Sequence, residues 1–156
     1  MITIRNAERK DMASVHGLIC ELAHYEKQPE AVITTAADLE RHGFDEHRFE
    51  CLVAENDSDG IVGMALFYPR YSTWKGPTLH LEDFYVRPAY RTQGVGKALF
   101  DRVVYLAAER KVGRMEWTVL EWNTIALDFY KKYGADLDSE WHLGTLNQQQ
   151  LAAFLK

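Results

Sequence analysis

The feature that most constrains the fold is a glycine-containing loop between a strand-like run and a helical pattern. Residues 79–86 read as a strand, and residues 91–98 have the sequence Arg-Thr-Gln-Gly-Val-Gly-Lys-Ala. Apolar residues then recur at helical spacing to about Lys111. The first amides of a helix have no partner within it, and the helix dipole favours negative charge there. The loop is therefore predicted to bind a pyrophosphate, the alternative being a simple glycine turn into a helix.

The spacing of the glycines excludes two familiar nucleotide loops. A nucleoside-triphosphate loop needs glycine and a hydroxyl residue where this chain has Arg91 and Ala98. A dinucleotide loop needs a third glycine where it has Leu99. What remains is Arg-x-x-Gly-x-Gly-x-Ala after an acidic and aromatic strand. This pattern resembles the acetyl-CoA loop of the GCN5-related N-acetyltransferase superfamily.

Composition sets the class of protein. A chain of 156 residues with 47% hydrophobic and 26% charged residues fits one globular domain, taken as residues 1–156. The net charge of −5 argues against a nucleic-acid partner and is compatible with a cationic substrate. Cys20 and Cys51 read as small packing residues in a reducing compartment, and no run suggests a signal peptide or membrane span. A cytoplasmic protein with no membrane partner is expected.

Strand and helix patterns are mixed along the chain, which indicates an α/β fold. Strands are expected over residues 2–4, 51–55, 61–68, 79–87, 116–120 and 141–146. Helices are expected over residues 9–26, 35–43, 96–111 and 124–133, and a short helix that begins at Asn147 is expected at the end of the chain. Thr35, Asn123 and Asn147 are suited to capping three of these helices, and residues 56–60 read as a hairpin turn.

Acetylation of an amine requires two proton transfers. A primary amine with a pKa near 10.4 must lose a proton before it attacks, and the departing thiolate is helped by a proton donor. Glu82, in the strand before the loop, is the candidate base; the alternative is a surface acid. Strand alternation would place it on one face with Phe84 and Val86. Tyr130, two turns into its helix, is the candidate acid; the alternative is a packing aromatic.

A closer resemblance covers nearly the whole chain through residue 141. Its motifs are Leu-Ala-His-Tyr-Glu at 22–26, His-Gly-Phe at 42–44, Cys-Leu-Val-Ala-Glu at 51–55, Tyr-Ser-Thr-Trp-Lys-Gly at 71–76, Leu-Glu-Asp-Phe-Tyr-Val at 81–86, Glu-Trp-Asn at 121–123 and Phe-Tyr-Lys-Lys-Tyr-Gly-Ala at 129–135. Together with the glycine loop, they resemble the diamine acetyltransferases, the spermidine/spermine and thialysine enzymes. The resemblance implies a mixed, mostly antiparallel sheet, splayed at the acetyl-CoA site and flanked by helices.

The resemblance also implies roles for individual residues. Glu82 would act as the base through water, and Tyr130 as the acid. Acetyl-CoA would contact Phe84, Tyr85, Val86, Arg91, Thr92, Gln93, Gly94, Val95, Gly96, Lys97, Asn123, Ala126, Tyr130 and Tyr133. The small cationic amine would contact Tyr25, Glu26, Trp74, Glu82, Asp83, Glu116, Trp117, Thr118 and Glu140. Family members are dimers, so a homodimer is expected, and part of the amine pocket could come from the partner subunit.

One departure from the family pattern concerns the amine pocket. Relatives often carry Glu-Gly-Trp where this chain has Ser139-Glu140-Trp141, so the aim of Glu140 stays open. The run at residues 72–76 favours a thialysine-type substrate. The histidines show no metal-ligand spacing, and no metal is expected. A peptide or protein N-acetyltransferase and a non-catalytic acyl-CoA-binding module are the alternatives.

Overall fold

The structure, a computed structural model, describes residues 1–155. It contains two compact units, Met1–Thr118 and the segment from Val119 onward. The first unit holds the sheet and three α-helices, and the second holds two α-helices joined by irregular chain. Each unit is described by itself.

The sheet of the first unit is open and mixed, as expected. Its strands are β1 (Ile2–Asn6), β2 (Glu50–Asn56), β3 (Gly60–Ser72), β4 (Gly76–Val86) and β5 (Met115–Glu116). They lie in chain order, and the pairs β1 with β2, β2 with β3 and β3 with β4 are antiparallel. The fifth is parallel to β4 and pairs with it only at Leu79 and His80. Within the described residues, the part of β4 from Leu81 to Val86 therefore has no neighbouring strand on the side of the sheet where β5 lies.

The helices begin and end near the predicted positions. In the first unit they are α1 (Met12–Tyr25), α2 (Ala36–Glu40) and α3 (Val95–Glu109); in the second, α4 (Thr124–Lys131) and α5 (Gln148–Ala152). The first turn expected for α1 is a 3-10 turn, Arg9–Asp11, and α2 continues as a π-helical turn, Arg41–Asp45. The predicted caps are confirmed, because the side chains of Thr35, Asn123 and Asn147 each accept a backbone hydrogen bond.

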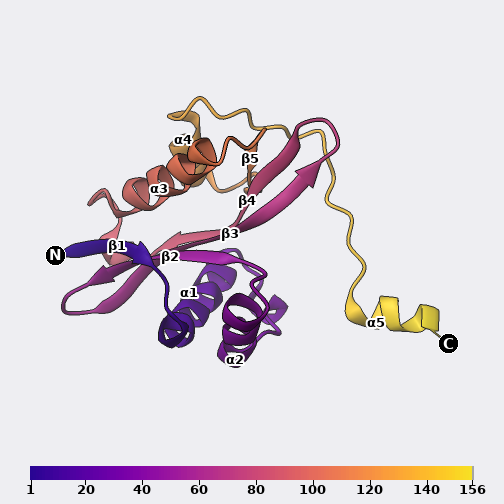
Figure 1. Ribbon diagram of the computed structural model, residues 1–156, viewed down its shortest axis with the longest axis horizontal. Coiled ribbons are helices and arrows are strands. Elements are labelled where there is room, and N and C mark those ends of the chain that lie inside the picture. The colour runs from indigo at the N-terminus through magenta and orange to yellow at the C-terminus, as the bar shows by residue number, and fades with distance from the viewer. Residues whose placement is uncertain (156) are drawn as a thin grey trace. The chain divides into compact units, whose positions relative to one another are not determined.

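The sheet of the first unit lies between α1 and α2 on one face and α3 on the other (Figure 1). Apolar side chains of α1, among them Met12, Val15 and Leu18, pack on strand residues that include Met64 and Tyr85. On the α3 side, the ring of Phe100 contacts Phe84 of β4 and Trp117, with centroid separations of 5.7 and 5.4 Å. Side chains on both faces of β4 therefore pack against helices close to the glycine loop.

Two predicted strands differ from the structure. The strand expected over residues 116–120 is only two residues long, Met115–Glu116, because Trp117 leaves the sheet edge and packs on Phe100. The strand expected over residues 141–146 is absent from the described chain, which is irregular there. β-propensity reflects the packing of side chains on a sheet, and this segment has no paired strand to supply it.

Candidate active site

The glycine loop forms the start of α3 as predicted. Gly94, at the N-cap, has a φ of +79°, and a Cβ added there would meet no atom within 4 Å. The amide of Ala98 donates to the carbonyl of Gly94 over 2.9 Å. The amides of Val95, Gly96 and Lys97 therefore precede this helical hydrogen bond. They can donate to an anion, where the dipole of a helix of 15 residues favours it.

The charged side chains of the loop have local partners. Arg91 donates from Nε to the carbonyl of Val86 over 2.8 Å, and its guanidinium lies 5.4 and 5.3 Å from the rings of Tyr25 and Tyr85. Lys97 forms an ion pair with Asp101 one turn further along α3. Arg91 thus ties the loop to the end of α1, and the backbone amides are the principal anion donors.

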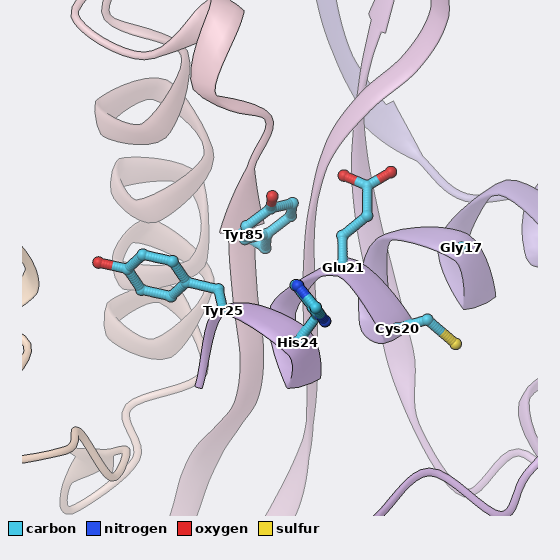
Figure 2. Close-up of a pocket in the computed structure, with 6 residues that line it drawn as sticks. All are labelled: Gly17, Cys20, Glu21, His24, Tyr25 and Tyr85. Carbon is cyan, nitrogen blue, oxygen red and sulfur yellow. The ribbon is translucent and has the colours of Figure 1, made fainter. Parts of the chain in front are cut away.

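An open pocket of about 510 Å³ lies next to this junction. Figure 2 shows its lining, which comes from the last turns of α1 and from Tyr85 of β4. Glu21 on α1 accepts from the guanidinium of Arg87 over 2.9 Å, which fixes the helix to the end of β4. Tyr25 and Tyr85, both predicted site residues, therefore line one pocket in the first unit.

A β-bulge places the candidate base. Asp83 pairs with Leu66, but Leu81 pairs with Phe67, so Glu82 is an extra residue on β4. Its Oε2 accepts a hydrogen bond of 2.8 Å from the hydroxyl of Tyr68. The prediction that Glu82 shares a face with Phe84 and Val86 is wrong, because the extra residue interrupts the alternation of β4. Phe84 packs on α3, whereas Glu82 faces Tyr68 and His80.

Three carboxyl groups lie near one another at the end of α1 and the bulge. Burial, and then the charges of Glu82 and Glu26, raise the pKa of Asp83 to about 6. Burial also raises the pKa of Glu26. Burial is the main cause of both shifts, because it disfavours the charged form of a carboxyl group. A cation bound beside Glu26, Glu82 and Asp83 would favour their charged forms.

A polar network beside Glu82 was not foreseen. His80 is 7% exposed, and its Nε2 lies 3.3 Å from Oε2 of Glu82. On the other side of the ring, Nδ1 lies 3.2 Å from Nη1 of Arg70 and 3.6 Å from Oε1 of Glu116. The sequence analysis gives His80 no role in the site. Its place two residues before Glu82 was the available signal, because residues at that spacing can share a strand face.

The other predicted amine contacts of the first unit have different surroundings. Glu116 forms ion pairs with Arg70 over 3.0 Å and with Arg114 over 2.8 Å. Trp117 packs on Phe100, Thr118 is exposed, and Trp74 lies in the turn after β3 with 81% of its surface exposed. Among these four residues, only Glu116 is linked to Glu82, because His80 contacts both carboxyl groups.

The remaining predicted residues belong to the second unit. Asn123 Oδ1 accepts from the amide of Ala126 over 3.2 Å, which begins α4. Tyr130 is 6% exposed, and its ring contacts that of Phe129 at 5.5 Å between centroids. Tyr133 is 37% exposed and contacts the same phenylalanine. Glu140 is exposed and donates its amide to Asp138 over 2.8 Å.

Within residues 1–155, no three His, Cys, Asp or Glu side chains are grouped so that they could hold a metal ion. No helix in that part of the chain has the length and apolar character needed to cross a membrane.

Comparison with known proteins gives the class. A sequence model of the acetyltransferase (GNAT) family matches residues 13–135, and the chain belongs to this family. It is an N-acetyltransferase that transfers acetyl to an amine, and the family implies acetyl-CoA as cosubstrate.

Two relatives and one solved structure show what the chain is similar to. The thialysine N-epsilon-acetyltransferase of Bos taurus is 40% identical over 90% of this chain and 89% of its own length. The spermidine/spermine N(1)-acetyltransferase-like protein 1 of Homo sapiens is also 40% identical, over 95% of this chain but 23% of that protein. Among solved structures, an integron cassette protein of V. cholerae matches with a TM-score of 0.78 at 22% identity, covering 99% of this chain and 98% of that one. This last likeness supports the fold alone.

Proposed function

We propose that the enzyme acetylates a primary amine of a small diamine, polyamine or lysine analogue such as thialysine. The observation that carries this proposal is the acidic cluster of Glu26, Glu82 and Asp83, two of whose carboxyls have raised pKa values. A substrate with a second cationic group would neutralise the cluster while its reacting amine lies near Glu82. The thialysine enzymes among the relatives support the same substrate class.

The glycine loop supports a place for the acetyl-CoA pyrophosphate. The free amides at the start of α3 would donate to the phosphates, and Gly94 supports this because it has a positive φ and open space around it. We assign the cofactor contacts to Phe84, Tyr85, Val86, Thr92, Gln93, Val95, Gly96, Lys97, Asn123, Ala126, Tyr130 and Tyr133, together with Gly94. Arg91 would act mainly by holding the loop against Tyr25 and Tyr85.

The proposed chemistry is direct transfer. Bound acetyl-CoA supplies the acetyl thioester. The Glu82 carboxylate accepts a proton from the substrate ammonium through water, so that the amine nitrogen can bond to the acetyl carbon. The carbon–sulfur bond breaks, and the Tyr130 hydroxyl gives its proton to the leaving sulfur. The second proton lost from the substrate nitrogen restores the Tyr130 hydroxyl, so the net proton released is the one held by Glu82. Cys51 is buried, and burial raises the pKa of its thiol to about 12, which disfavours a covalent acetyl-cysteine route through it.

Three further statements complete the proposal. The amine pocket also includes Tyr25, Trp74, Glu116, Trp117, Thr118 and Glu140, a set that follows from the family resemblance. Residues 1–156 form one N-acetyltransferase domain. The protein is a cytoplasmic homodimer without a nucleic-acid or membrane partner.

Two variants and an amine panel test the function. CoA release is measured with thialysine, lysine, putrescine, cadaverine, spermidine and spermine. Glu82→Gln should lose most activity at neutral pH and recover part of it at high pH, where more of the amine is already neutral.

Tyr130→Phe should lower turnover and leave acetyl-CoA affinity nearly unchanged. Activity on peptides with none on the amine panel would overturn the substrate class, and full activity of either variant would overturn that residue's role.

A further inference from the structure

Five polar side chains from three strands meet on one face of the sheet. Tyr68 and Arg70 alternate on β3, His80 lies directly opposite Tyr68 on β4, and Glu116 of β5 pairs with His80. The rings of Tyr68 and His80 are 5.3 Å apart between centroids. The bulge adds Glu82 to this group, which we call the His80 network. Its centre is a buried imidazole with a polar partner at each nitrogen.

The partners of His80 define which nitrogen carries the proton. Arg70 has only hydrogen-bond donors, so Nδ1 of His80 is the acceptor of the 3.2 Å contact from Nη1. The proton of the neutral ring is then on Nε2, which lies 3.3 Å from Oε2 of Glu82. A proton on Nδ1 as well would face the guanidinium at 3.2 Å, whereas the carboxylate oxygen Oε1 of Glu116 lies farther from Nδ1, at 3.6 Å. Arg70 is itself held by Glu116 over 3.0 Å.

Two donor groups consequently lie near the same oxygen of Glu82. The hydroxyl of Tyr68 donates over 2.8 Å, and burial together with this bond raises the pKa of Tyr68 to about 12, so the phenol keeps its proton. The Nε2–H of His80 approaches the same Oε2. The carboxylate is thus held by one oxygen, and Oε1 is left to meet a water or the amine.

We propose that His80 is a positioning residue for the catalytic base, with Arg70 fixing its Nε2–H tautomer. The inference rests on the proposed role of Glu82. A carboxylate on a bulge of an open sheet edge has many rotamers, and proton transfer requires one geometry. Two donors from neighbouring strands select that geometry, and Glu116 keeps Arg70 in place. His80 does not touch the substrate in this scheme.

Nitrogen NMR of the enzyme with labelled histidine tests the tautomer directly. The expected spectrum at pH 7 shows a protonated Nε2 and an unprotonated Nδ1 for His80, assigned by loss of the signals in His80→Gln. The Nδ1–H tautomer, or a ring protonated at both nitrogens, would overturn the proposal. This measurement uses the unaltered enzyme, so it holds even where a substitution impairs folding.

Kinetics test the consequence for Glu82. His80→Phe removes the donor and should lower kcat roughly ten- to hundredfold, the loss expected for one hydrogen bond to a charged group, with KM for acetyl-CoA unchanged. His80→Gln can still donate from its amide and should retain kcat within about threefold. A merely packing role predicts the reverse order, because phenylalanine fills the ring volume better than glutamine does.

A pair of arginine variants provides the matched control. Arg70→Gln should lower kcat in the same direction as His80→Phe. Arg110→Gln removes a comparable ion pair, to Glu50, and should leave kcat unchanged. If Glu82→Gln is inactive but His80→Phe is fully active, this inference fails and the function stands. If Glu82→Gln is fully active, the role of the base itself fails.

Discussion

At the scale of single residues, two adjacent carboxyl groups on β4 have different environments. Glu82 lies on the bulge, half exposed; its Oε2 accepts from the hydroxyl of Tyr68 and lies 3.3 Å from Nε2 of His80. Asp83 lies deeper, near the carboxyl groups of Glu26 and Glu82, and its pKa is raised to about 6. These environments fit the roles we propose, in which Glu82 accepts a proton and Asp83 binds a cation that relieves its charge.

The raised pKa of Asp83 gives a prediction about stability. The folded pKa of about 6 exceeds the unfolded 3.8, so ionisation destabilises the folded state. The destabilisation is absent below the unfolded pKa, grows between the two values and is complete above about pH 6, where it amounts to about 3 kcal/mol. Asp83→Asn should therefore raise the Tm at pH 8 clearly more than at pH 5, measured by calorimetry without ligand.

The same variant should bind the amine more weakly, because it removes a negative charge from the cluster. The exposed Asp136→Asn is the matched control and should change neither property. An Asp83→Asn variant whose Tm gain is equal at both pH values would contradict the buried, ionised carboxyl.

At the scale of elements, the sequence predicted the turns and helix caps that are fixed by interactions between residues close together in the chain. The turn at residues 56–60 was predicted, and in the structure Asn56 Oδ1 accepts the amides of Ser58 and Asp59 over 2.9 and 3.0 Å. The caps of α2 and α4 were predicted for the same reason. The end of β5 was not, because the strand-like run after Glu116 gives no sign that Trp117 packs on Phe100.

The candidate site likewise has parts that could be found in the sequence and parts that could not. The glycine loop and the acidic residues of β4 were visible as motifs in the sequence. The partners of His80 come from β3 and β5, and the bulge at Glu82 depends on how β3 and β4 pair. No periodicity in one strand reveals a bulge, because the extra residue is defined only by the partner strand.

A glycine at the start of α3 gives a prediction about acetyl-CoA binding, and a second glycine elsewhere in the chain provides the control. Gly94 and Gly60 have φ values of +79° and +69°, and a Cβ would meet open space at both. Gly94→Ala and Gly60→Ala should each cost about 1–2 kcal/mol of unfolding free energy through backbone strain. Only Gly94→Ala should raise KM for acetyl-CoA, because only that loop leads to the anion-binding amides. Equal KM values in the two variants would argue against the loop as the pyrophosphate site.

At the scale of the whole molecule, the second unit bears on the proposed homodimer. Its last part, residues 141–155, exposes several large apolar side chains to more than half of their surface: Trp141, Leu143, Leu146, Leu151, Phe154 and Leu155. A monomer rarely leaves so many apolar groups in water. A second copy of the chain would cover them.

Analytical ultracentrifugation tests this directly. The expected mass is twice the 18.0 kDa of the chain. The double variant Leu143→Glu/Phe154→Glu should sediment as a monomer, because charge at the centre of an apolar contact is costly. Ile33→Glu, at an apolar residue of the first unit that is 72% exposed, is the control and should stay dimeric. A monomeric unaltered protein would refute the dimer.

The bulge on β4 also bears on how such a site can arise and be lost. Because Glu82 is one residue more than the ladder with β3 requires, deleting it would leave Leu81 and Asp83 as consecutive partners of Phe67 and Leu66. The shortened hairpin could pair without interruption, and nothing in the hydrophobic core would have to change sequence. In this fold, a single-codon insertion or deletion in one hairpin separates a regular scaffold from one that presents the carboxylate we propose as the base.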